Sequence, residues 1–462
     1  MGQKSRNNRL FHSSIILLLV SLSAALSSPF QLQTLLPRPL PSAPTLSWHD
    51  SEPESNSLQE TSQLDPLSSN TTLEVQLELH HVDALSSEDT PELLFDLRLQ
   101  RDALRSGTIY SLVSKAVARN PPRAAGRRSG FSSSIISGLA QGSGEYFTRL
   151  GVGTPARNLY MVLDTGSDVV WVQCSPCKSC YSQSDPIFDP TKSASFSVSY
   201  GDGSVTFGDF STETLTFRRT SVGRVALGCG HDNEGLFVGA AGLLGLGRGI
   251  LSFPSQTGSR FNRKFSYCLV DRSASSKPSS LVFGDAAIPR GALFTPLLTN
   301  PKLDTFYYVE LLGISVGGTR VPKISPSLFK MDQDGNGGVI IDSGTSVTRL
   351  TQPAYTAMRD AFRLGATNLK RAPDFSLFDT CFDLSGQTSV KVPTLVLHFR
   401  GADLSLPATN YLIPVDSSGT FCFAFAGTMN GLSIIGNIQQ QGFRVAYDLA
   451  GSRVGFSPRG CA

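Results

Sequence analysis

The sequence has few charged residues and no long run of basic ones. Lys, Arg, Asp and Glu make up only 17% of its 462 residues, and the formal net charge is +3. An excess of positive charge this small and this scattered argues against a nucleic-acid partner. No segment after the first 28 residues is long and apolar enough to span a bilayer, so we expect no stable membrane anchor.

Turn-forming and apolar residues are abundant instead. Apolar residues make up 40% of the chain, which also has 43 Gly and 27 Pro. Frequent turns between short apolar segments are typical of a β-rich protein. A chain of this length exceeds one ordinary hydrophobic core, which favours two lobes with extensions.

Residues 1–28 predict a cleaved signal peptide. Lys4, Arg6 and Arg9 precede an apolar stretch over residues 15–26, and small residues follow it. A signal anchor is the alternative, but the apolar stretch is short for a spanning helix. We therefore expect the chain to enter the secretory pathway.

Eight cysteines in an exported chain indicate disulfide bonds, although their spacing does not fix the connectivity. Cys174, Cys177 and Cys180 are spaced closely enough to suggest a metal site. No His lies nearby, so we favour disulfides and expect no metal. The eight disulfide candidates are Cys174, Cys177, Cys180, Cys229, Cys268, Cys381, Cys422 and Cys461.

Residues 29–140 differ in character from the rest of the chain. Residues 29–72 are rich in Pro, Ser and Thr, which is typical of a linker, and Asn70 begins a candidate glycosylation sequon. The alternation over residues 73–79 predicts a strand, and residues 91–119 predict one or two helices. The predicted apolar face of this helical region consists of Leu93, Leu94, Leu97, Leu104 and Leu112.

A basic stretch rich in Pro and Gly follows at residues 121–128. It predicts an exposed junction suited to proteolysis, with a permanent linker as the alternative. We therefore interpret residues 29–140 as a prosegment and linker.

Beyond residue 140 the chain repeats itself. Residues 146–153 are echoed by residues 307–317, and each copy is followed by an apolar strand ending in Asp-Thr-Gly or Asp-Ser-Gly. Further along, each half contains an apolar-apolar-Gly strand, at residues 243–245 and 434–436. The repeat predicts an N-terminal β lobe over residues 141–298 and a C-terminal β lobe over residues 299–462.

An Asp follows an apolar strand at the same place in each repeat. The Gly two positions after this Asp lets the backbone turn sharply and approach the other lobe closely. We expect the hydroxyl at the second position of each motif to form a hydrogen bond with the backbone of the opposite lobe. We expect the hydroxyl at the fourth position to form a hydrogen bond with the outer oxygen of the Asp carboxylate. One such motif alone is usually a surface turn, but two in matching positions predict a catalytic pair. The motifs are Asp164-Thr165-Gly166-Ser167 and Asp342-Ser343-Gly344-Thr345.

These motifs resemble those of pepsin-like aspartic proteases, and within them the plant nepenthesin-like group, including the guard-cell aspartic protease type. The resemblance covers residues 140–462. It implies an all-β, bilobal fold with a catalytic cleft between two duplicated lobes. It also implies that the predicted hairpin at residues 197–207 is a flap over the cleft. The flap and substrate-binding residues would be Tyr200, Gly201, Asp202 and Gly203.

The chain departs from the family pattern just before this hairpin. Relatives carry a long cysteine-rich insert there, but Asp164 and Tyr200 are only 36 positions apart in this chain. With the insert missing, we expect Cys174, Cys177 and Cys180 to lack their usual partners.

The resemblance implies an aspartic-type endopeptidase, a hydrolase made as a zymogen and active at acidic pH, in which the Asp dyad activates a water molecule. Its partners would be polypeptide substrates and its own prosegment, with a basic side chain near the junction paired to the dyad. We expect a monomer without a cofactor, in the apoplast or extracellular space, the vacuole or the endoplasmic reticulum. The alternative is a non-catalytic binding or inhibitor protein with the pepsin fold, against which both intact Asp motifs argue.

Overall fold

The computed structural model describes most of the chain after residue 145 and three segments before it. The described residues are 30–40, 74–85, 89–118, 146–193, 197–198, 208–218, 220–233, 239–270, 279–458 and 461. The predicted signal peptide, the junction, Asn70, Tyr200, Gly201, Asp202 and Gly203 lie outside them. Within these ranges, none of the helices is long and apolar enough to cross a bilayer.

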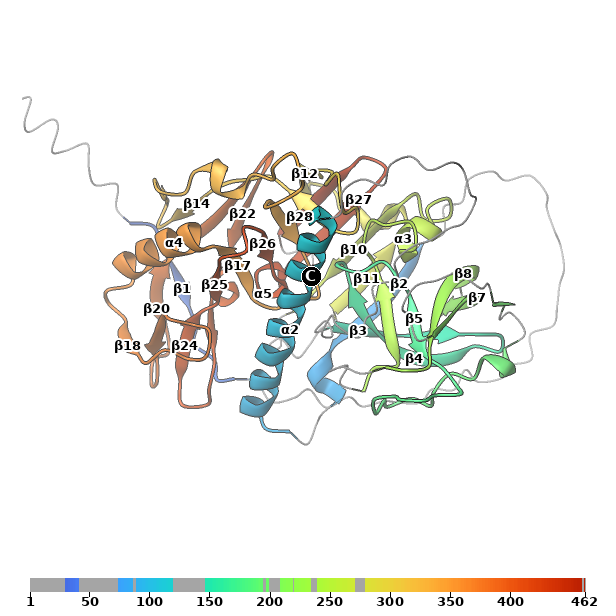
Figure 1. Ribbon diagram of the computed structural model, residues 1–462. Helices are drawn as coiled ribbons and strands as arrows, with labels where there is room; N and C mark the ends of the chain where they lie inside the picture. The colour runs from blue at the N-terminus through green and yellow to red at the C-terminus, as the bar shows by residue number, and fades with distance from the viewer. Residues whose placement is uncertain are drawn as a thin grey trace, which may run out of the picture.

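Two β lobes lie side by side with one long helix, α2 (Pro91–Ala118), between them (Figure 1). A 13-stranded sheet dominates the N-terminal lobe and takes in strands from the end of the chain. Its order is β12 (Leu293–Pro296), β28 (Arg453–Pro458), β27 (Phe443–Asp448), β10 (Lys264–Cys268), β11 (Ser279–Phe283), β2 (Val75–His81), β3 (Tyr146–Val152), β4 (Arg157–Asp164), β9 (Gly242–Gly245), β5 (Trp171–Gln173), β8 (Thr220–Gly230), β7 (Gly208–Phe217) and β6 (Ser197–Val198).

The C-terminal lobe contains smaller sheets. The first has the order β13 (Tyr307–Val309), β16 (Val339–Ile341), β26 (Ser433–Ile435), β17 (Thr348–Thr351) and β25 (Phe425–Thr428). The second has the order β15 (Thr319–Arg320), β14 (Leu311–Val316), β21 (Leu395–Phe399) and β22 (Ala402–Leu406). The third has the order β18 (Lys370–Ala372), β19 (Cys381–Asp383), β24 (Thr420–Phe423) and β23 (Leu412–Pro414). A two-stranded sheet joins β1 (Leu32–Leu35) to β20 (Val390–Pro393).

Short helices connect these strands. They are α3 (Phe253–Gln256), α4 (Gln352–Gly365), α5 (Asn437–Gln440), η1 (Val82–Leu85), η3 (Pro190–Lys192), η4 (Asp285–Ala287), η5 (Pro326–Phe329) and η6 (Ala408–Asn410). The all-β, bilobal fold expected from the sequence is confirmed.

The predicted duplication has the same strand arrangement in each lobe. β3 runs antiparallel to β4 in one lobe, as β13 does to β16 in the other. The apolar-apolar-Gly strands β9 and β26 lie parallel to β4 and β16. A strand buried between such neighbours is apolar on both faces, which explains the continuous apolar runs before each Asp motif.

β2 brings a part of the predicted prosegment into the large sheet. It lies antiparallel between β11 and β3, and it corresponds to the strand expected near residues 73–79. Val75, Leu77 and Leu79 are buried, whereas the intervening Gln76 and Glu78 are exposed. This alternation of period two is what an antiparallel strand with one buried face requires.

α2 confirms the predicted helix but not its apolar face. Leu93 and Leu104 are 46% and 53% exposed, so their predicted burial is wrong. Charged side chains take up much of the buried face, because this helix packs against polar and charged residues of both lobes rather than only against a core. The buried charged residues of α2 are Arg98, Arg101, Asp102 and Arg105.

Candidate active site

Each lobe places one buried aspartate where the two lobes meet. Asp164 is the last residue of β4, Asp342 directly follows β16, and both are 0% exposed. Neighbouring strands fix their backbones: Leu246 N donates to Asp164 O at 2.7 Å, and Asp342 N donates to Ile435 O at 3.1 Å. The duplicated strand pairs therefore bring the two Asp residues to matching positions.

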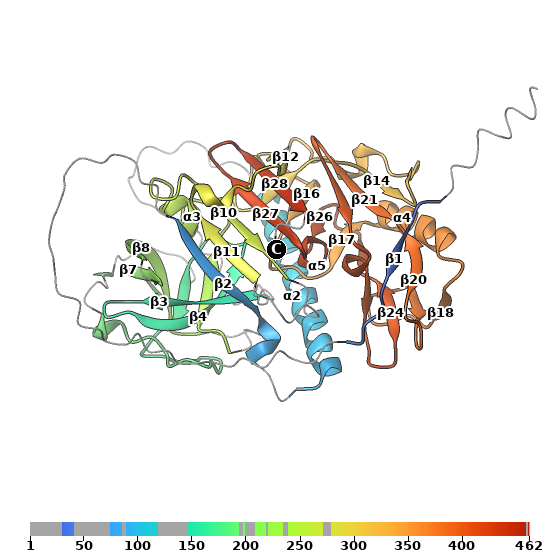
Figure 2. The ribbon, with the colours of Figure 1, turned by 180° about the vertical axis from the view of Figure 1, so that it is seen from behind.

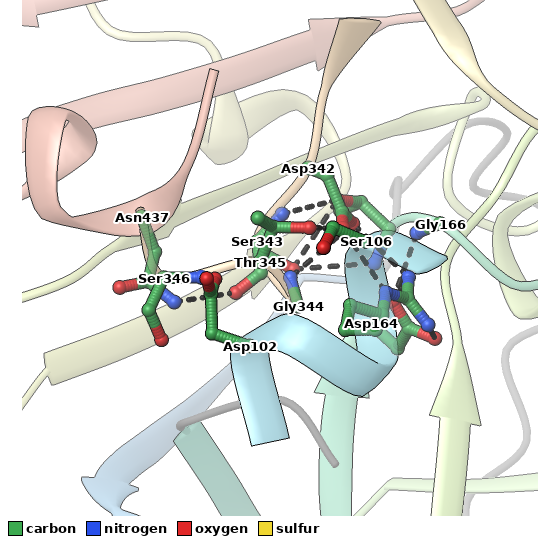
Figure 3. A network of polar contacts seen from close by, with 12 residues as sticks. Asp102, Ser106, Asp164, Gly166, Asp342, Ser343, Gly344, Thr345, Ser346 and Asn437 are labelled. Atoms are coloured by element: carbon green, nitrogen blue, oxygen red, sulfur yellow. Dashed lines mark hydrogen bonds and ion pairs between the residues drawn. The ribbon is translucent and has the colours of Figure 1, made fainter. Parts of the chain in front are cut away.

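The second residue of each motif ties the lobes together. Ser343 N donates to Thr165 Oγ1 at 2.8 Å, and Thr165 N donates to Ser343 Oγ at 3.2 Å. The two hydroxyls also lie within hydrogen-bonding distance of each other, at 3.2 Å. This exchange fixes the spacing of the two motif backbones, and Figure 3 shows its surroundings.

The two motif glycines allow the carboxylates to approach closely. A Cβ atom added to Gly166 would lie 2.7 Å from Asp342 Oδ1, and one added to Gly344 would lie 2.8 Å from Asp164 Oδ1. Real Cβ atoms do not tolerate such contacts, so each glycine is required by the carboxylate of the other lobe. The Gly166 and Gly344 amides also donate to the Asp164 and Asp342 carboxylates of their own lobes, at 2.9 and 3.2 Å.

The fourth residues of the motifs behave differently in the two lobes. Thr345 Oγ1 donates to Asp342 Oδ2 at 2.6 Å, as expected from the sequence. Ser167 Oγ is buried and forms no hydrogen bond of normal geometry with the described residues, although a weaker hydrogen bond from its side chain helps to lower the pKa of Asp164. Both oxygens of Asp164 instead accept hydrogen bonds from Arg105.

Arg105 of α2 lies between the two carboxylates. Its Nη2 and Nη1 donate to Asp164 Oδ1 and Oδ2 at 2.6 and 3.0 Å. Its Nε and Nη2 donate to Asp342 Oδ2 and Oδ1, both at 3.2 Å. The planar guanidinium thus bridges both carboxylates with its fork of donors, the geometry in which Arg binds carboxylates most strongly.

Burial and charge oppose each other at this site. Burial raises the pKa of Asp164, and the Asp342 charge raises it further, whereas the Arg105 charge lowers it. Burial alone would lower the pKa of Arg105, but the two carboxylates outweigh it and raise that pKa. Arg105 therefore stays charged, and Asp164 takes up a proton more readily than an ordinary Asp.

Asp102 forms a second buried contact between α2 and the C-terminal lobe (Figure 3). Its Oδ1 accepts from Ser346 N at 2.7 Å and from Val347 N at 2.9 Å. Its Oδ2 lies 2.5 Å from Arg349 Nη1. Burial raises the pKa of Asp102, while Arg349 and the two amides oppose the rise. Asp102 and Arg105 are three residues apart, so one face of α2 carries both contacts.

The basic residue at the dyad is not where the sequence led us to expect it. We expected it near the junction at residues 121–128, whereas Arg105 lies in the middle of α2. A signal was present, because residues 98, 101, 102 and 105 place charges at helical spacing on one face. That pattern is also typical of a solvated face, so the sequence alone did not identify it.

The eight cysteines form four disulfides. Cys174, Cys177 and Cys180 each have a partner, and the expectation that these differ from the usual partners in the family stays a prediction. The pairing of Cys174 has a local reason: Cys174 follows β5, which lies parallel to β8 and so places Cys174 near Cys229. The pairs are Cys174–Cys229, Cys177–Cys180, Cys268–Cys461 and Cys381–Cys422.

A duplicated, two-lobed β fold with one buried Asp from each lobe at the cleft defines the pepsin-like aspartic proteases as a class. Family models place the chain within it. The model described as xylanase inhibitor N-terminal matches residues 146–198 and 195–285, and the one described as xylanase inhibitor C-terminal matches residues 306–458. The first match breaks at the position where the sequence indicated a missing insert.

Relatives in plants specify the family further. The chain is 72% identical over 415 residues to aspartyl protease family protein 2 of Arabidopsis thaliana, covering 84% of this chain and 85% of the relative. It is 50% identical over 391 residues to the protein aspartic protease in guard cell 2 of the same plant, covering 79% and 82%. It is 39% identical over 401 residues to aspartic proteinase nepenthesin-1 of Nepenthes gracilis, covering 79% and 90%.

Among solved structures, the crystal structure titled edgp has a TM-score of 0.55 at 21% identity, covering 71% of this chain and 94% of that one. A likeness at this identity supports the fold alone. The sequence relatives show more: the chain belongs to the plant family of pepsin-like aspartic proteases and is an aspartic-type endopeptidase.

Proposed function

We propose that the protein is a secreted, acid-activated endopeptidase whose own α2 helix holds the precursor inactive. The observation that carries this proposal is the Arg105 guanidinium, which contacts all four carboxylate oxygens of Asp164 and Asp342 at 2.6 to 3.2 Å. A group in that place excludes both a water molecule and a substrate carbonyl from the dyad.

Once α2 leaves, the dyad performs acid–base catalysis. Two carboxylates this close share one proton, a behaviour for which aspartic-protease dyads are themselves the standard example. The ionised carboxylate removes a proton from a water molecule, whose oxygen attacks the peptide carbonyl. The protonated carboxylate donates its proton to the carbonyl oxygen. Collapse of the resulting tetrahedral diol breaks the C–N bond: the amine leaves with the proton that the dyad took from water, and a diol hydroxyl returns its proton to the other carboxylate.

Acid is a suitable trigger because both contacts of α2 depend on ionised carboxylates. Burial raises the pKa of Asp164 and of Asp102, but the Arg105 and Arg349 charges lower these pKa values, so each ion pair favours the ionised carboxyl and loses its stabilising effect as the pH falls. Protonation removes the attraction of Asp164 for Arg105 and that of Asp102 for Arg349. The helix is therefore held at neutral pH and is released as the pH falls.

Secretion fits the cysteine chemistry. All eight cysteines are paired, and structural disulfides persist in oxidising compartments. Together with the predicted signal peptide, this supports an extracellular, vacuolar or endoplasmic-reticulum location and polypeptide substrates met there.

The test is hydrolysis of casein or haemoglobin by the purified precursor before and after acidification. We expect activity after acidification, complete inhibition by pepstatin, and a loss of at least about 100-fold in Asp164→Asn, the usual scale for removing an acid–base group. Asp334→Asn, at an exposed turn, is the matched control and should retain full activity. Activity that persists in Asp164→Asn would refute the role given to the dyad.

A non-catalytic binding or inhibitor function is the second candidate. The description of the matching family models as xylanase inhibitors favours it, as does the missing insert before the predicted flap. The intact pair Asp164 and Asp342 argues against it. Precursor that never hydrolyses protein at any acidic pH, although α2 has been released, would favour this second function.

A further inference from the structure

The segment at residues 30–40 binds the C-terminal lobe as an added strand. β1 pairs antiparallel with β20, with Leu32 opposite Pro393 and Leu35 opposite Val390. Figure 2 shows β1 alongside β20, at the side of this lobe away from β2 and the N-terminal lobe. Among the described residues β20 pairs with no other strand, so β1 provides its whole ladder.

The backbone contacts of this segment continue beyond the strand. Gln31 N donates to Gly317 O at 2.8 Å, and Thr394 N donates to Gln31 O at 3.0 Å. The ring of Phe30 occupies the space that a Cβ atom on Gly317 or on Gly365 would fill. The lobe is therefore shaped around the beginning of the segment as well as around its strand.

Side chains add specific contacts. Leu35 is 1% exposed, and Leu40 is buried in the cluster that contains Ile413. Gln33 Nε2 lies 3.0 Å from Leu406 O and 2.6 Å from the Tyr411 hydroxyl. The segment thus uses buried leucines and a neutral amide, as peptides do when they extend a sheet and place alternate side chains in pockets.

These contacts do not depend on the acid chemistry that releases α2. Residues 30–40 contain no Asp, Glu or His, and the described residues that line the adjoining groove contain none either. The titratable or charged groups that face the segment are Arg98, Lys391 and Tyr411. Lys and Arg stay charged and Tyr stays neutral from neutral to acidic pH. Release of α2 removes Arg98 and Phe95 from the groove, but it leaves the contacts with β20 unchanged.

We propose that residues 30–40 stay on the C-terminal lobe after the prosegment helix has gone, as a separate, non-covalently bound chain of the mature enzyme. The surface of the C-terminal lobe beside β20 therefore binds an extended, mostly apolar peptide, namely residues 30–40. The proposal rests on the proposed release of α2 and on the predicted proteolysis of the prosegment, but what it states is that residues 30–40 bind the C-terminal lobe by themselves.

The experiment uses the full-length chain carrying Asp164→Asn, which cannot cleave itself. A recognition site for a specific protease is inserted between residues 41 and 73 and is cut, and the product is passed through a size-exclusion column at neutral and at acidic pH. We expect the N-terminal fragment, quantified by mass spectrometry, to elute with the lobes in equal amount at both pH values. Elution of the wild-type fragment by itself would overturn the proposal.

A matched pair of variants tests the site. Leu35→Asp should increase the rate of fragment loss at least tenfold, whereas Leu36→Asp, at a residue that is 57% exposed, should leave it unchanged. Gln33→Ala, a milder change, should increase the rate to an intermediate extent. Equal loss from Leu35→Asp and Leu36→Asp would contradict binding through this face. Because the chain is inactive and cut from outside, failure here is separate from failure of the proposed proteolysis.

Discussion

Replacing Arg105 by Gln should allow the precursor to open and become active without acidification. The substitution keeps a polar side chain of similar length but removes the charge that faces Asp164 and Asp342. It leaves two buried carboxylates next to a neutral side chain, and burial already raises the pKa of Asp164. The closed state can then persist only if the dyad takes up protons or if α2 moves away and water enters.

The expected size of the effect follows from the burial of this ion pair. Arg105 and both Asp side chains are at most 1% exposed. Removing one partner of such a pair costs about 3–5 kcal/mol. At 1.4 kcal/mol per factor of ten, the ratio of closed to open precursor should fall by roughly 100- to 4,000-fold.

The pH dependence gives the sign of the effect. In the wild type the attraction between Arg105 and Asp164 is present above the pKa of Asp164 and is lost as the pH falls through it. Wild-type precursor should therefore open on acidification. The Arg105→Gln precursor should already be open at a pH where the wild type is closed, and it should show a weaker pH dependence of opening.

The assay is initial turnover of a fluorogenic peptide by intact precursor, with gel analysis to exclude chain cleavage. Arg105→Lys keeps one charge without the planar fork and should fall between wild type and Arg105→Gln. Lys115→Gln, at an exposed position of the same helix, should behave like the wild type. If the Arg105→Gln precursor turned the peptide over no faster than the wild-type precursor at every pH, the reasoning would be refuted.

Three further outcomes are expected. Asp102→Asn removes the charge paired with Arg349 and should shift precursor activation to higher pH, measured by activity against pH; an unchanged profile would count against this second contact. Gly344→Ala places a Cβ atom 2.8 Å from Asp164 Oδ1 and should lower kcat/KM by about 100-fold or more, with a circular dichroism spectrum like that of the wild type. Replacing Cys174 and Cys229 by Ser opens a loop with a sequence separation of 55 and should reduce the free energy of unfolding by about 4 kcal/mol in urea titrations; equal midpoints would contradict this.

The duplicated lobes and the two Asp motifs could be predicted from the sequence because their information is local and repeated. An apolar strand, a carboxylate and a glycine occur in the same order twice, and a parallel partner strand follows each copy. The geometry then requires only that matching repeats pack symmetrically. The hydroxyl exchange between Thr165 and Ser343 follows from the same symmetry.

The contacts of α2 could not be predicted in the same way. Leucine spacing indicated one apolar face, but Leu93 and Leu104 are exposed, and the helix buries Asp102 and Arg105 instead. A buried charge is favourable only beside its partner, and the partners of these two residues lie more than fifty positions away in the chain. Sequence spacing along one helix contains no information about such partners.

The pairing of β1 with β20 was also beyond the sequence. A strand of four residues gives a weak periodic signal, and Leu32–Leu35 lies in a stretch whose Pro and Ser content is typical of a linker. The pairing depends on β20, which pairs with no other strand among the described residues of the C-terminal lobe. This free strand is available only after that lobe has folded. Short, distant strand pairs of this kind are the least predictable contacts in a chain.

The central position of β2 has a practical consequence for anyone producing this protein. The order β11–β2–β3 makes β2, a strand of the predicted prosegment, the only bridge, among the described residues, between two blocks of the large sheet. A recombinant chain begun after the junction would leave the facing sides of β11 and β3 without hydrogen-bond partners in the middle of the molecule. Open edges of this kind pair with other copies, so a chain produced without β2 should aggregate unless another strand takes its place, as must happen when the mature enzyme forms.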